Sequence, residues 1–274
     1  MKDVHATVAY KEFAGEKYFR LGLKVGWDEF APGQFVMVQV PGGEVLLRRP
    51  FGIVKTEGGV LEVCVKIVGK GTRALSQISP GQSAQVLGPL GRGFTIPKDA
   101  KTAVLIAGGY GIAPLLPLAH KFKDENKKIV FYYGAKKSPD LLYINELKTM
   151  GIDLRIATED GSAGEKGLVT DSLRNVIANE VKQSHGIATA PSGPRNDYIK
   201  SIFACGPEGM LKEVARIASE AKIPAQVSLE RYMACGVGVC LGCVVKSRDG
   251  SYVRACREGP VFDAEDVEWN AEKT

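Results

Sequence analysis

Four cysteines near the C-terminus have a spacing that suits metal binding. Cys235, Cys240 and Cys243 lie within nine residues, separated mostly by glycine, and Cys256 follows, which gives the pattern C-x4-C-x2-C-x12-C. Glycines admit positive φ, so that several amides can turn inward and stabilise the charge of thiolates and of an iron–sulfur core. The first three cysteines match the plant-type [2Fe–2S] run, although the fourth lies closer than in that pattern. We therefore predict that these four thiols bind a [2Fe–2S] cluster.

Other uses of cysteine remain open at this point. A structural zinc site also takes four cysteines, but usually as two C-x2-C knuckles, and this chain has one. Disulfides need an oxidising compartment, for which the sequence gives no sign. The other two cysteines, Cys64 and Cys205, stand in apolar runs typical of strands, and for Cys64 we expect a buried structural thiol.

Two stretches of the N-terminal part could bind a phosphate-bearing cofactor. Arg48-Arg49-Pro50-Phe51-Gly52 places two arginines at the start of an apolar strand, and Lys66–Arg73 runs from a strand end through a glycine loop into a short helical pattern. Backbone amides at such a loop and helix start suit a pyrophosphate. A purely structural glycine turn explains either stretch alone, so the prediction depends on their occurrence together.

A third glycine motif has the context of a dinucleotide site. The buried strand expected at 102–107 is followed by Gly108-Gly109-Tyr110-Gly111-Ile112-Ala113-Pro114 and then by a helix. A second strand end carries Cys205-Gly206-Pro207. Ligands of open α/β sheets bind at the C-terminal ends of strands. Lys136 and Lys137 follow the next strand and could face a 2′-phosphate or only solvent, so NAD and NADP both stay open.

The elements that position these motifs change in kind near residue 100. Residues 1–98 contain six short alternating runs broken by glycine and proline turns, which predicts a small antiparallel barrel, with a sandwich as the alternative. Residues 102–228 alternate strands and helices, as a parallel sheet requires. Within them, 178–197 is polar and aperiodic, and we expect a surface insertion there with a solvated His185. Residues 229–274 form the predicted cluster subdomain.

Composition limits the function further. The chain has 274 residues, 45% hydrophobic and 24% charged, with a mild net charge of +5. Its Lys and Arg are scattered, which does not favour nucleic-acid binding. The sequence has no apolar leader and no run approaching the ~18 apolar residues of a membrane span, so we expect a cytoplasmic location and no membrane contact.

Taken together, these motifs resemble the flavin- and nicotinamide-binding module of the ferredoxin reductase family. The tail, from Leu229-Glu230-Arg231-Tyr232 to Gly259-Pro260-Val261-Phe262, resembles the electron-transfer subunits of two-subunit, NAD-linked bacterial dihydroorotate dehydrogenases. The resemblance implies FAD, a [2Fe–2S] cluster and NAD as cofactors. It also implies an FMN-containing catalytic subunit as partner, two of each in a heterotetramer, and a role in pyrimidine biosynthesis. Electrons taken from dihydroorotate on the partner would reach NAD+ through the cluster and then FAD.

The resemblance also assigns residues. The FAD contacts that it implies are Arg49, Pro50, Phe51, Gly52, Lys66, Ile67, Val68, Gly71 and Thr72. The nicotinamide contacts that it implies are Gly108, Gly109, Gly111, Ile112, Ala113, Pro114, Cys205, Gly206 and Pro207. Its cluster ligands are Cys235, Cys240, Cys243 and Cys256. No residue is expected in an acid–base role, because the cofactors supply the chemistry.

The chain departs from the family at Gly52, where a serine is usual, so a hydroxyl contact to the flavin must be absent or replaced. Two other functions remain open. One is an NAD(P)H-linked subunit of a ferredoxin reductase or soluble hydrogenase. The other is a redox sensor or binding module whose cluster controls contact with another protein without turnover.

Overall fold

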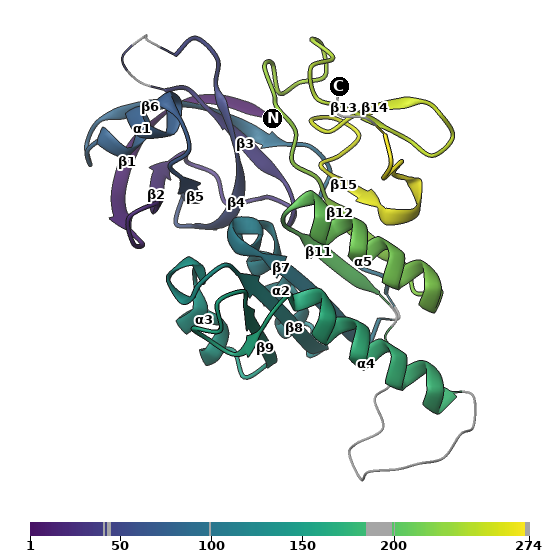
Figure 1. Ribbon diagram of the computed structural model, residues 1–274. Coiled ribbons are helices and arrows are strands. Elements are labelled where there is room, and N and C mark those ends of the chain that lie inside the picture. Colours follow the sequence, from purple (N-terminus) through teal and green to yellow (C-terminus); the bar gives the residue numbers. More distant parts are fainter. Residues whose placement is uncertain (41, 43–44, 99, 185–198, 200, 272–274) are drawn as a thin grey trace.

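The computed structural model describes residues 1–40, 42, 45–98, 100–184, 199 and 201–271 of the chain. Figure 1 shows three parts: a barrel formed by the N-terminal third, an open sheet below it, and a C-terminal segment beside both.

The first part is a closed antiparallel barrel with the strand order β1-β2-β5-β4-β3-β6. The alternation of small or apolar residues with polar ones gives each strand an inner face, so that in β6 Ala84 and Val86 are buried between exposed or half-buried neighbours. The predicted antiparallel barrel of six strands is therefore confirmed. The strands are Lys2–Phe13 (β1), Tyr18–Lys24 (β2), Phe35–Val38 (β3), Arg49–Glu57 (β4), Val60–Lys66 (β5) and Ser83–Leu90 (β6), with helix Lys70–Gln77 (α1) before β6.

The second part is a seven-stranded sheet in the order β10-β9-β8-β7-β11-β12-β15. All its strand pairs are parallel except the last. The chain starts at β7, moves outward through β8 and β9, and returns to the other side of β7 with β11, so the switch in strand order lies between β7 and β11. The strands are Thr102–Gly108 (β7), Lys128–Ala135 (β8), Asp153–Thr158 (β9), Glu165–Lys166 (β10), Ile202–Cys205 (β11), Ala225–Ser228 (β12) and Val261–Asp263 (β15).

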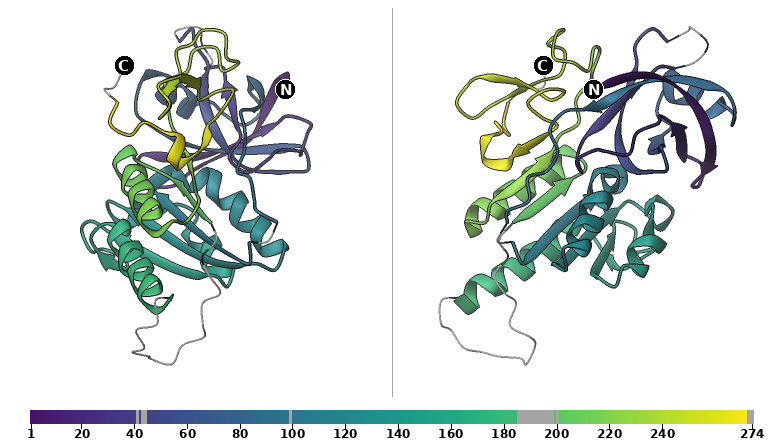
Figure 2. Two further views of the ribbon diagram at one scale, coloured as in Figure 1. Left: turned by 90° about the vertical axis from the view of Figure 1, so that its right-hand side faces the viewer. Right: turned by 180° about the vertical axis from the view of Figure 1, so that it is seen from behind.

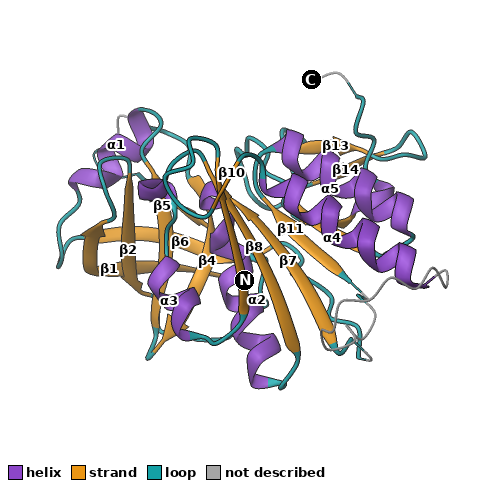
Figure 3. Ribbon diagram, turned by 60° about the horizontal axis from the view of Figure 1, so that its bottom comes forward, coloured by secondary structure: helices purple, strands orange, loops and turns teal. Residues whose placement is uncertain are grey.

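Two pairs of helices cover the two faces of this sheet, as Figure 3 shows. Alternate residues of β7 separate the faces. Ala103, Leu105 and Ala107 pack with α2 and α3, whereas Val104 and Ile106 pack with α4 and α5. Because both faces are covered, the strands read as continuous apolar runs. The helices are Ile112–Asp124 (α2), Ile144–Thr149 (α3), Val169–Ser184 (α4) and Glu208–Ala221 (α5), with short 3-10 turns at Gly109–Gly111 (η1) and Ser138–Asp140 (η2).

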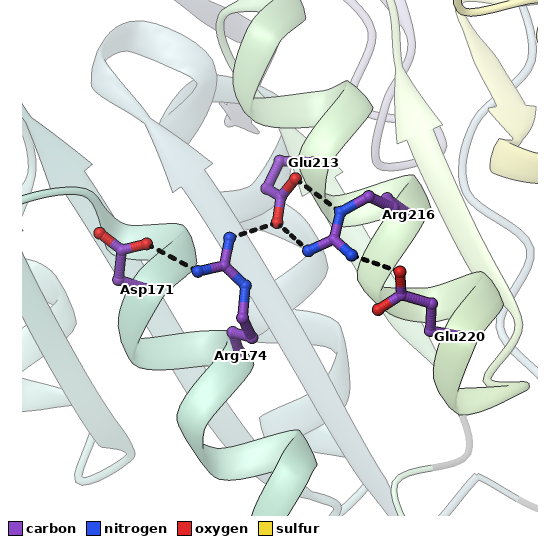
Figure 4. A network of polar contacts seen from close by, with 5 residues as sticks. All are labelled: Asp171, Arg174, Glu213, Arg216 and Glu220. Carbon is purple, nitrogen blue, oxygen red and sulfur yellow. Dashed lines mark hydrogen bonds and ion pairs between the residues drawn. The ribbon is translucent and has the colours of Figure 1, made fainter.

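A chain of ion pairs links α4 to α5 on the outer surface (Figure 4). Arg174 of α4 lies 2.5 Å from Glu213 of α5, and Arg216 lies 2.7 Å from the same carboxylate. Asp171 and Glu220 extend the chain at either end. The two guanidinium groups hold the pKa of Glu213 at about 2, the hydrogen bond from Arg216 being the largest cause.

The surface insertion expected at 178–197 is partly wrong. Helix α4 continues to Ser184, so the first seven residues of that stretch are helical. The polar sequence hid this because helix formation depends on tertiary packing as well as on apolar periodicity. The rest of the stretch, including His185, lies outside the described residues.

The third part, the C-terminal segment, is joined to both others. A hairpin of Val244–Lys246 (β13) and Tyr252–Arg254 (β14) follows the cysteine loop, and β15, followed by the 3-10 turn Ala264–Asp266 (η3), then pairs antiparallel with β12. The amide of Arg92, just beyond β6, donates to the carbonyl of Gly259 at 2.6 Å. The views of Figure 2 agree that this segment lies against the barrel and the edge of the sheet. The division at residue 229 therefore does not coincide with a break in packing.

Within the described part of the chain, none of the helices combines the length and the apolar character that crossing a bilayer would need.

Candidate functional site

The four C-terminal cysteines gather around one loop. Cys243 and Cys256 are buried, Cys235 is half-buried and Cys240 is exposed. The amide of Ala255 donates to the carbonyl of Cys243 at 2.9 Å, which brings the last two cysteines together across the β13–β14 hairpin.

The thiols contact one another in two pairs. Cys235 hydrogen-bonds Cys240, and Cys256 hydrogen-bonds Cys243. Among the described residues, no group of three or more His, Cys, Asp or Glu is arranged to hold a metal ion. Two pairs, each able to supply two thiolates to one iron, fit a two-iron cluster by donor type and number.

Backbone amides surround the first sulfur. The amides of Val237 and Cys240 lie 3.4 and 3.5 Å from Cys235 Sγ, and that of Gly242 lies 3.5 Å from Cys240 Sγ. Burial opposes ionisation of Cys235, but these amides outweigh it and lower the pKa of its thiol to about 6. Burial and the contact with Cys243 raise the pKa of Cys256 to about 12. The loop is thus built to carry negative charge at its exposed end.

The conformation of the loop explains its glycines. Gly236 and Gly238 have φ of 72° and 85°, and Leu241 takes the left-handed conformation too, with φ of 57°. A Cβ at Gly236 would lie 2.5 Å from the side chain of Met37 in β3, so the loop lies directly on the barrel. From the other side Arg254 donates to the carbonyl of Gly238 at 3.0 Å and forms a two-pronged ion pair with Glu258.

The motif Arg49-Pro50-Phe51-Gly52 of the barrel lies beside the first turn of helix α1. The four residues Arg49 to Gly52 are half-buried in β4. A Cβ at Gly71 would lie 3.0 Å from Arg49 Nε, so the guanidinium reaches the first turn of α1. A Cβ at Gly52 would meet Pro114 Cδ at 3.7 Å, an ordinary contact, so neither steric crowding nor strain explains the glycine in place of serine.

Some of the backbone groups predicted to contact FAD already have partners. The amide of Ile67 donates to Lys17, and the amides of Val68 and Gly69 donate to the hydroxyl of Thr72 at 2.9 and 3.2 Å. The first intrahelical bond of α1 comes from Arg73. Helix geometry therefore leaves the amides of Lys70, Gly71 and Thr72 to face a phosphate, and Thr72 itself acts as a cap.

The two glycine motifs of the sheet meet at the switch point between β7 and β11. A Cβ at Gly111 would lie 2.2 Å from the carbonyl of Cys205, and one at Gly206 would lie 2.9 Å from Gly108 Cα. Only glycine permits so close an approach of the two loops. This is the place where open α/β sheets bind their ligands, and the backbone cradle fits a dinucleotide pyrophosphate.

Not every residue predicted there can touch a ligand with its side chain. Ile112 and Ala113 are buried in the core between the sheet and α2. Burial raises the pKa of Cys205, whose thiol hydrogen-bonds Ser228, so this cysteine is a neutral thiol in the core.

Tyr110 and Glu230, to which the sequence analysis assigned no role, join the barrel, the sheet and the cluster segment together with Lys66, an expected FAD contact. Tyr110, in the glycine turn after β7, donates from its hydroxyl to Glu230, the second residue of the cluster segment. The Lys66 ammonium, at the end of β5, lies 5.2 Å from the centre of the Tyr110 ring. Burial by the surrounding protein atoms raises the pKa of the Glu230 carboxyl, although part of the residue's surface remains exposed to solvent. Glu230 stands in the C-terminal tail that resembles the family, but no local pattern in the sequence pairs it with Tyr110.

The basic pair after β8 has acidic neighbours. Lys136 and Lys137 are exposed, and the amides of Glu159 and Asp160 donate to the carbonyls of Ala135 and Lys136. Charges of both signs therefore lie at this strand end.

Three family models match the chain in the order of its three parts. Residues 12–94 match an oxidoreductase FAD-binding domain, residues 105–216 an oxidoreductase NAD-binding domain, and residues 230–268 the iron–sulfur cluster binding domain of dihydroorotate dehydrogenase B.

Full-length relatives agree with these models. The chain is 38% identical over 268 residues to the dihydroorotate dehydrogenase B (NAD(+)) electron transfer subunit of Desulforamulus reducens, covering 95% of this chain and 92% of the relative. The corresponding subunit of Clostridium perfringens is 34% identical, with 86% of this chain and 87% of the relative covered. This chain belongs to the family of dihydroorotate dehydrogenase B electron transfer subunits.

Solved structures support the same family fold. A chain of an NADH-dependent reduced ferredoxin–NADP oxidoreductase superposes with a TM-score of 0.81 at 30% identity, covering 97% of this chain and 91% of that one. The predicted fold class and the FAD-, NAD- and iron–sulfur-binding domains are thereby confirmed. The individual residues assigned to each cofactor stay predictions.

Proposed function

We propose that this chain connects an FMN-containing catalytic subunit, which oxidises dihydroorotate, to NAD+. Electrons would enter the chain at the cluster in the loop Cys235–Cys243. They would leave it at the nicotinamide site formed by the loops Gly108–Pro114 and Cys205–Pro207. When bound, the cluster supplies one-electron transfer and FAD supplies the exchange between one- and two-electron chemistry. The protein contributes position, a charged environment and exclusion of water.

The observation that carries this proposal is the contact between the cluster loop and the flavin motif. Gly236 lies against Met37 of β3, and Met37 pairs with Pro50 of β4. One strand pair thus separates the cysteine loop from Arg49-Pro50-Phe51-Gly52. A redox centre held in that loop would have a direct path through packed protein to a flavin held by that motif.

On the NAD side, Gly52 and Pro114 are in contact, so the flavin motif also borders the start of α2. Arg49 and the α1 amides supply positive charge for the pyrophosphate of FAD. The glycine loops Gly108–Pro114 and Cys205–Pro207 leave room for the pyrophosphate of the nicotinamide nucleotide. Tyr110, Glu230 and Lys66 lie where the barrel, the sheet and the cluster segment meet, and we assign them to positioning at this junction.

For the partner we propose the face around the cluster loop. Val239 and Leu241 expose 80% and 59% of their surface, whereas Val237 is half-buried and packs on the core. Two apolar side chains beside the exposed Cys240 favour a partner that covers the cluster. An apolar docking surface would also bring a second redox centre close to it.

The test uses the anaerobically purified chain with and without the FMN subunit. The isolated chain should oxidise NADH with a dye and leave dihydroorotate unoxidised, and the FMN subunit should restore dihydroorotate-dependent NAD+ reduction. Leu241→Asp should abolish the coupled reaction and spare the dye reaction, because it adds a buried charge to the interface. Aspartate tolerates the left-handed conformation of this position, so the loop itself is not strained.

Leu241→Met, which keeps an apolar side chain of similar volume, is the matched control and should retain coupling. Dihydroorotate oxidation by the isolated chain would refute the subunit proposal. Coupled activity that survives Leu241→Asp would move the docking surface elsewhere. The mass of the complex tests the expected heterotetramer of two copies of each subunit, and a cytoplasmic location remains an expectation from the sequence.

A second candidate function has one observation in its favour. The likeness to the ferredoxin–NADP oxidoreductase chain extends over 97% of this chain, including the cluster segment. A different catalytic partner, with ferredoxin or NADP(H) as substrate, therefore fits the same fold. Copurification from native extract, with flavin analysis and rates with NADH and NADPH, distinguishes the two.

A further inference from the structure

A buried carboxylate from a residue not assigned to any cofactor lies between the barrel and the sheet. Glu62 of β5 is 1% exposed. Its two oxygens accept separate hydrogen bonds, from the Tyr10 hydroxyl at 2.5 Å and from the Tyr143 hydroxyl at 2.7 Å. A carboxylate without water is costly unless its oxygens are satisfied, so these bonds are needed. Tyr10 belongs to the barrel, but Tyr143 belongs to the sheet domain.

Tyr143 is held in an unusual conformation. It has φ of 55° at the start of α3, in a region that aromatic residues rarely occupy. Its ring lies under the Arg20 guanidinium, 5.8 Å from the ring centre. Burial raises the pKa of its hydroxyl, which therefore stays protonated and donates to Glu62. Such a backbone conformation persists only where the surrounding structure fixes it, and residues held in this way cluster at functional sites.

The preceding residue in the chain, Leu142, continues the contact toward the loop Gly108–Gly111. The amide of Leu142 donates to the Tyr133 hydroxyl at 2.9 Å, and that hydroxyl donates to the carbonyl of Gly109 at 3.1 Å. Tyr133 lies on β8 and is fully buried. Its hydroxyl has one proton and uses it on Gly109, so the direction of every bond in this series is fixed.

A hollow and apolar contacts surround these bonds at the interface of the two domains. A hollow of about 440 Å³ lies beside Tyr143, lined by Phe13, Arg20 and Cys64 from the barrel and by Pro139 and residues 141–146 from the sheet domain. Around it, apolar side chains of the barrel such as Val54 pack with Leu141 and Leu142 of the sheet domain. The bond of Tyr143 to Glu62 crosses this interface beside the contacts of Tyr143 with Arg20 and Cys64.

We propose that Tyr143 and Tyr133 are positioning residues for the nicotinamide nucleotide. Through Glu62 they hold the carbonyl of Gly109, and hence the loop Gly108–Gly111, at a fixed place relative to the flavin-binding barrel. This rests on the proposed function, since it takes that loop as the dinucleotide site. Neither tyrosine touches the ligand, so their removal alters how well the loop is placed and leaves flavin binding alone.

The experiment compares single deletions of buried tyrosine hydroxyls, one before α3 and two on β8. Tyr143→Phe and Tyr133→Phe should each raise the KM for NADH about three- to tenfold, the effect of one lost buried hydrogen bond. FAD content should stay that of the wild type, and kcat with a dye should change less than KM. The control is Tyr132→Phe, because Tyr132 is equally buried on β8 but its hydroxyl bonds Arg155 on the other face. It should cost similar thermal stability and leave the KM for NADH unchanged.

A double variant separates positioning from general weakening. Glu62 and Tyr133 are not in contact, so independent effects of Glu62→Gln and Tyr133→Phe would multiply. If the bonds act as one series, the double variant should raise KM by little more than the larger single effect. Effects that multiply, or a KM in Tyr143→Phe and Tyr133→Phe that matches Tyr132→Phe, would overturn the inference while the wild type still oxidises NADH. A wild-type chain that cannot oxidise NADH would instead overturn the proposed function, and the inference with it.

Discussion

The cluster loop and the junction where the barrel, the sheet and the cluster segment meet both hold a redox group, but they do so in opposite ways. The loop takes its four thiols from 22 residues, and its shape follows from a few backbone conformations at Gly236, Gly238 and Leu241. The junction is assembled from the barrel, the switch point and Glu230. A local site depends on each of its ligands, so single changes should remove function. A dispersed site shares its contacts among many groups, so single changes should weaken it in steps.

The largest effect is expected at a cluster ligand. Cys240→Ser should abolish iron and sulfide binding, because one iron loses a thiolate that no neighbour replaces. Metal analysis and the visible spectrum of anaerobically purified protein measure this; the wild type should be brown, with about two irons and two sulfides per chain.

Cys64→Ser is the matched control and should retain the cluster, since burial raises the pKa of the Cys64 thiol to about 12 and keeps it neutral. Stoichiometric zinc without iron in the wild type would contradict the cluster assignment.

A smaller effect is expected at the flavin motif. Arg49→Ala removes a cation beside the start of α1, and a hydrogen bond involving a charged group contributes ~1.5–3 kcal/mol, which corresponds to roughly 10- to 100-fold weaker FAD retention. Flavin released on dilution measures it, and iron content should not change.

The exposed Arg248 provides the comparison, because Arg248→Ala removes the same charge far from the motif. Equal flavin loss in both variants would mean that only net charge matters, and the graded, shared character of the junction would need another explanation.

The support of the cluster loop should show an intermediate behaviour. Arg254→Ala removes the bond to the carbonyl of Gly238, so the loop should open more often and lose iron to a chelator roughly three- to tenfold faster, as expected for ~1 kcal/mol. Absorbance decay after chelator addition measures the rate.

Arg257→Ala is the neighbouring control, since Arg257 is mostly exposed and lies 4.0 Å from Glu258. If Arg254→Ala and Arg257→Ala both lose iron at the wild-type rate, the cysteine–iron bonds alone hold the loop. The loop would then differ even more from the junction, whose contacts are shared among many groups.

The smallest effect is expected at the ion pairs between α4 and α5, which touch neither site. Glu213 has its pKa lowered to about 2 by Arg216 and Arg174, so its contribution is present above the unfolded pKa near 4.5 and is lost as pH falls toward 2. Glu213→Gln should therefore lower the free energy of unfolding by no more than ~1 kcal/mol at pH 7, and the difference should fade in acid.

Urea unfolding at pH 7 and pH 3 measures the change, with the KM for NADH as internal control. A shift of that KM would show that the sheet face and the dinucleotide site are coupled, contrary to the comparison.

The sequence carried much of the fold because the decisive signals are local. The six barrel strands, the strand–glycine–helix start at Gly108 and the cysteine spacing are all patterns within short windows. What it could not carry depends on contacts between distant segments. The bond of Tyr110 to Glu230, the bond of Tyr143 to Glu62 and the pairing of β15 with β12 each join residues more than 30 apart.

Local patterns also mislead where packing decides. Helix α4 continues through a polar stretch to Ser184, and Val237 packs on the core although Val239 and Leu241 of the same loop are exposed. At Ile112 and Cys205 the motif was recognised, but the side chains fill the core and only the backbone borders the cradle.

The position of β15 has a consequence for how the protein is made. This strand follows Cys256 in the chain and is the last strand of the sheet, so a nascent chain ending at Ser228 would present β12 as an open edge. Unpaired edges invite association with other chains. We expect a truncation there to aggregate, and expect the nucleotide domain to reach its mature form only when the thiol-bearing segment has folded. Sheet completion and the maturation of the iron–sulfur site are then a single step in the life of the polypeptide.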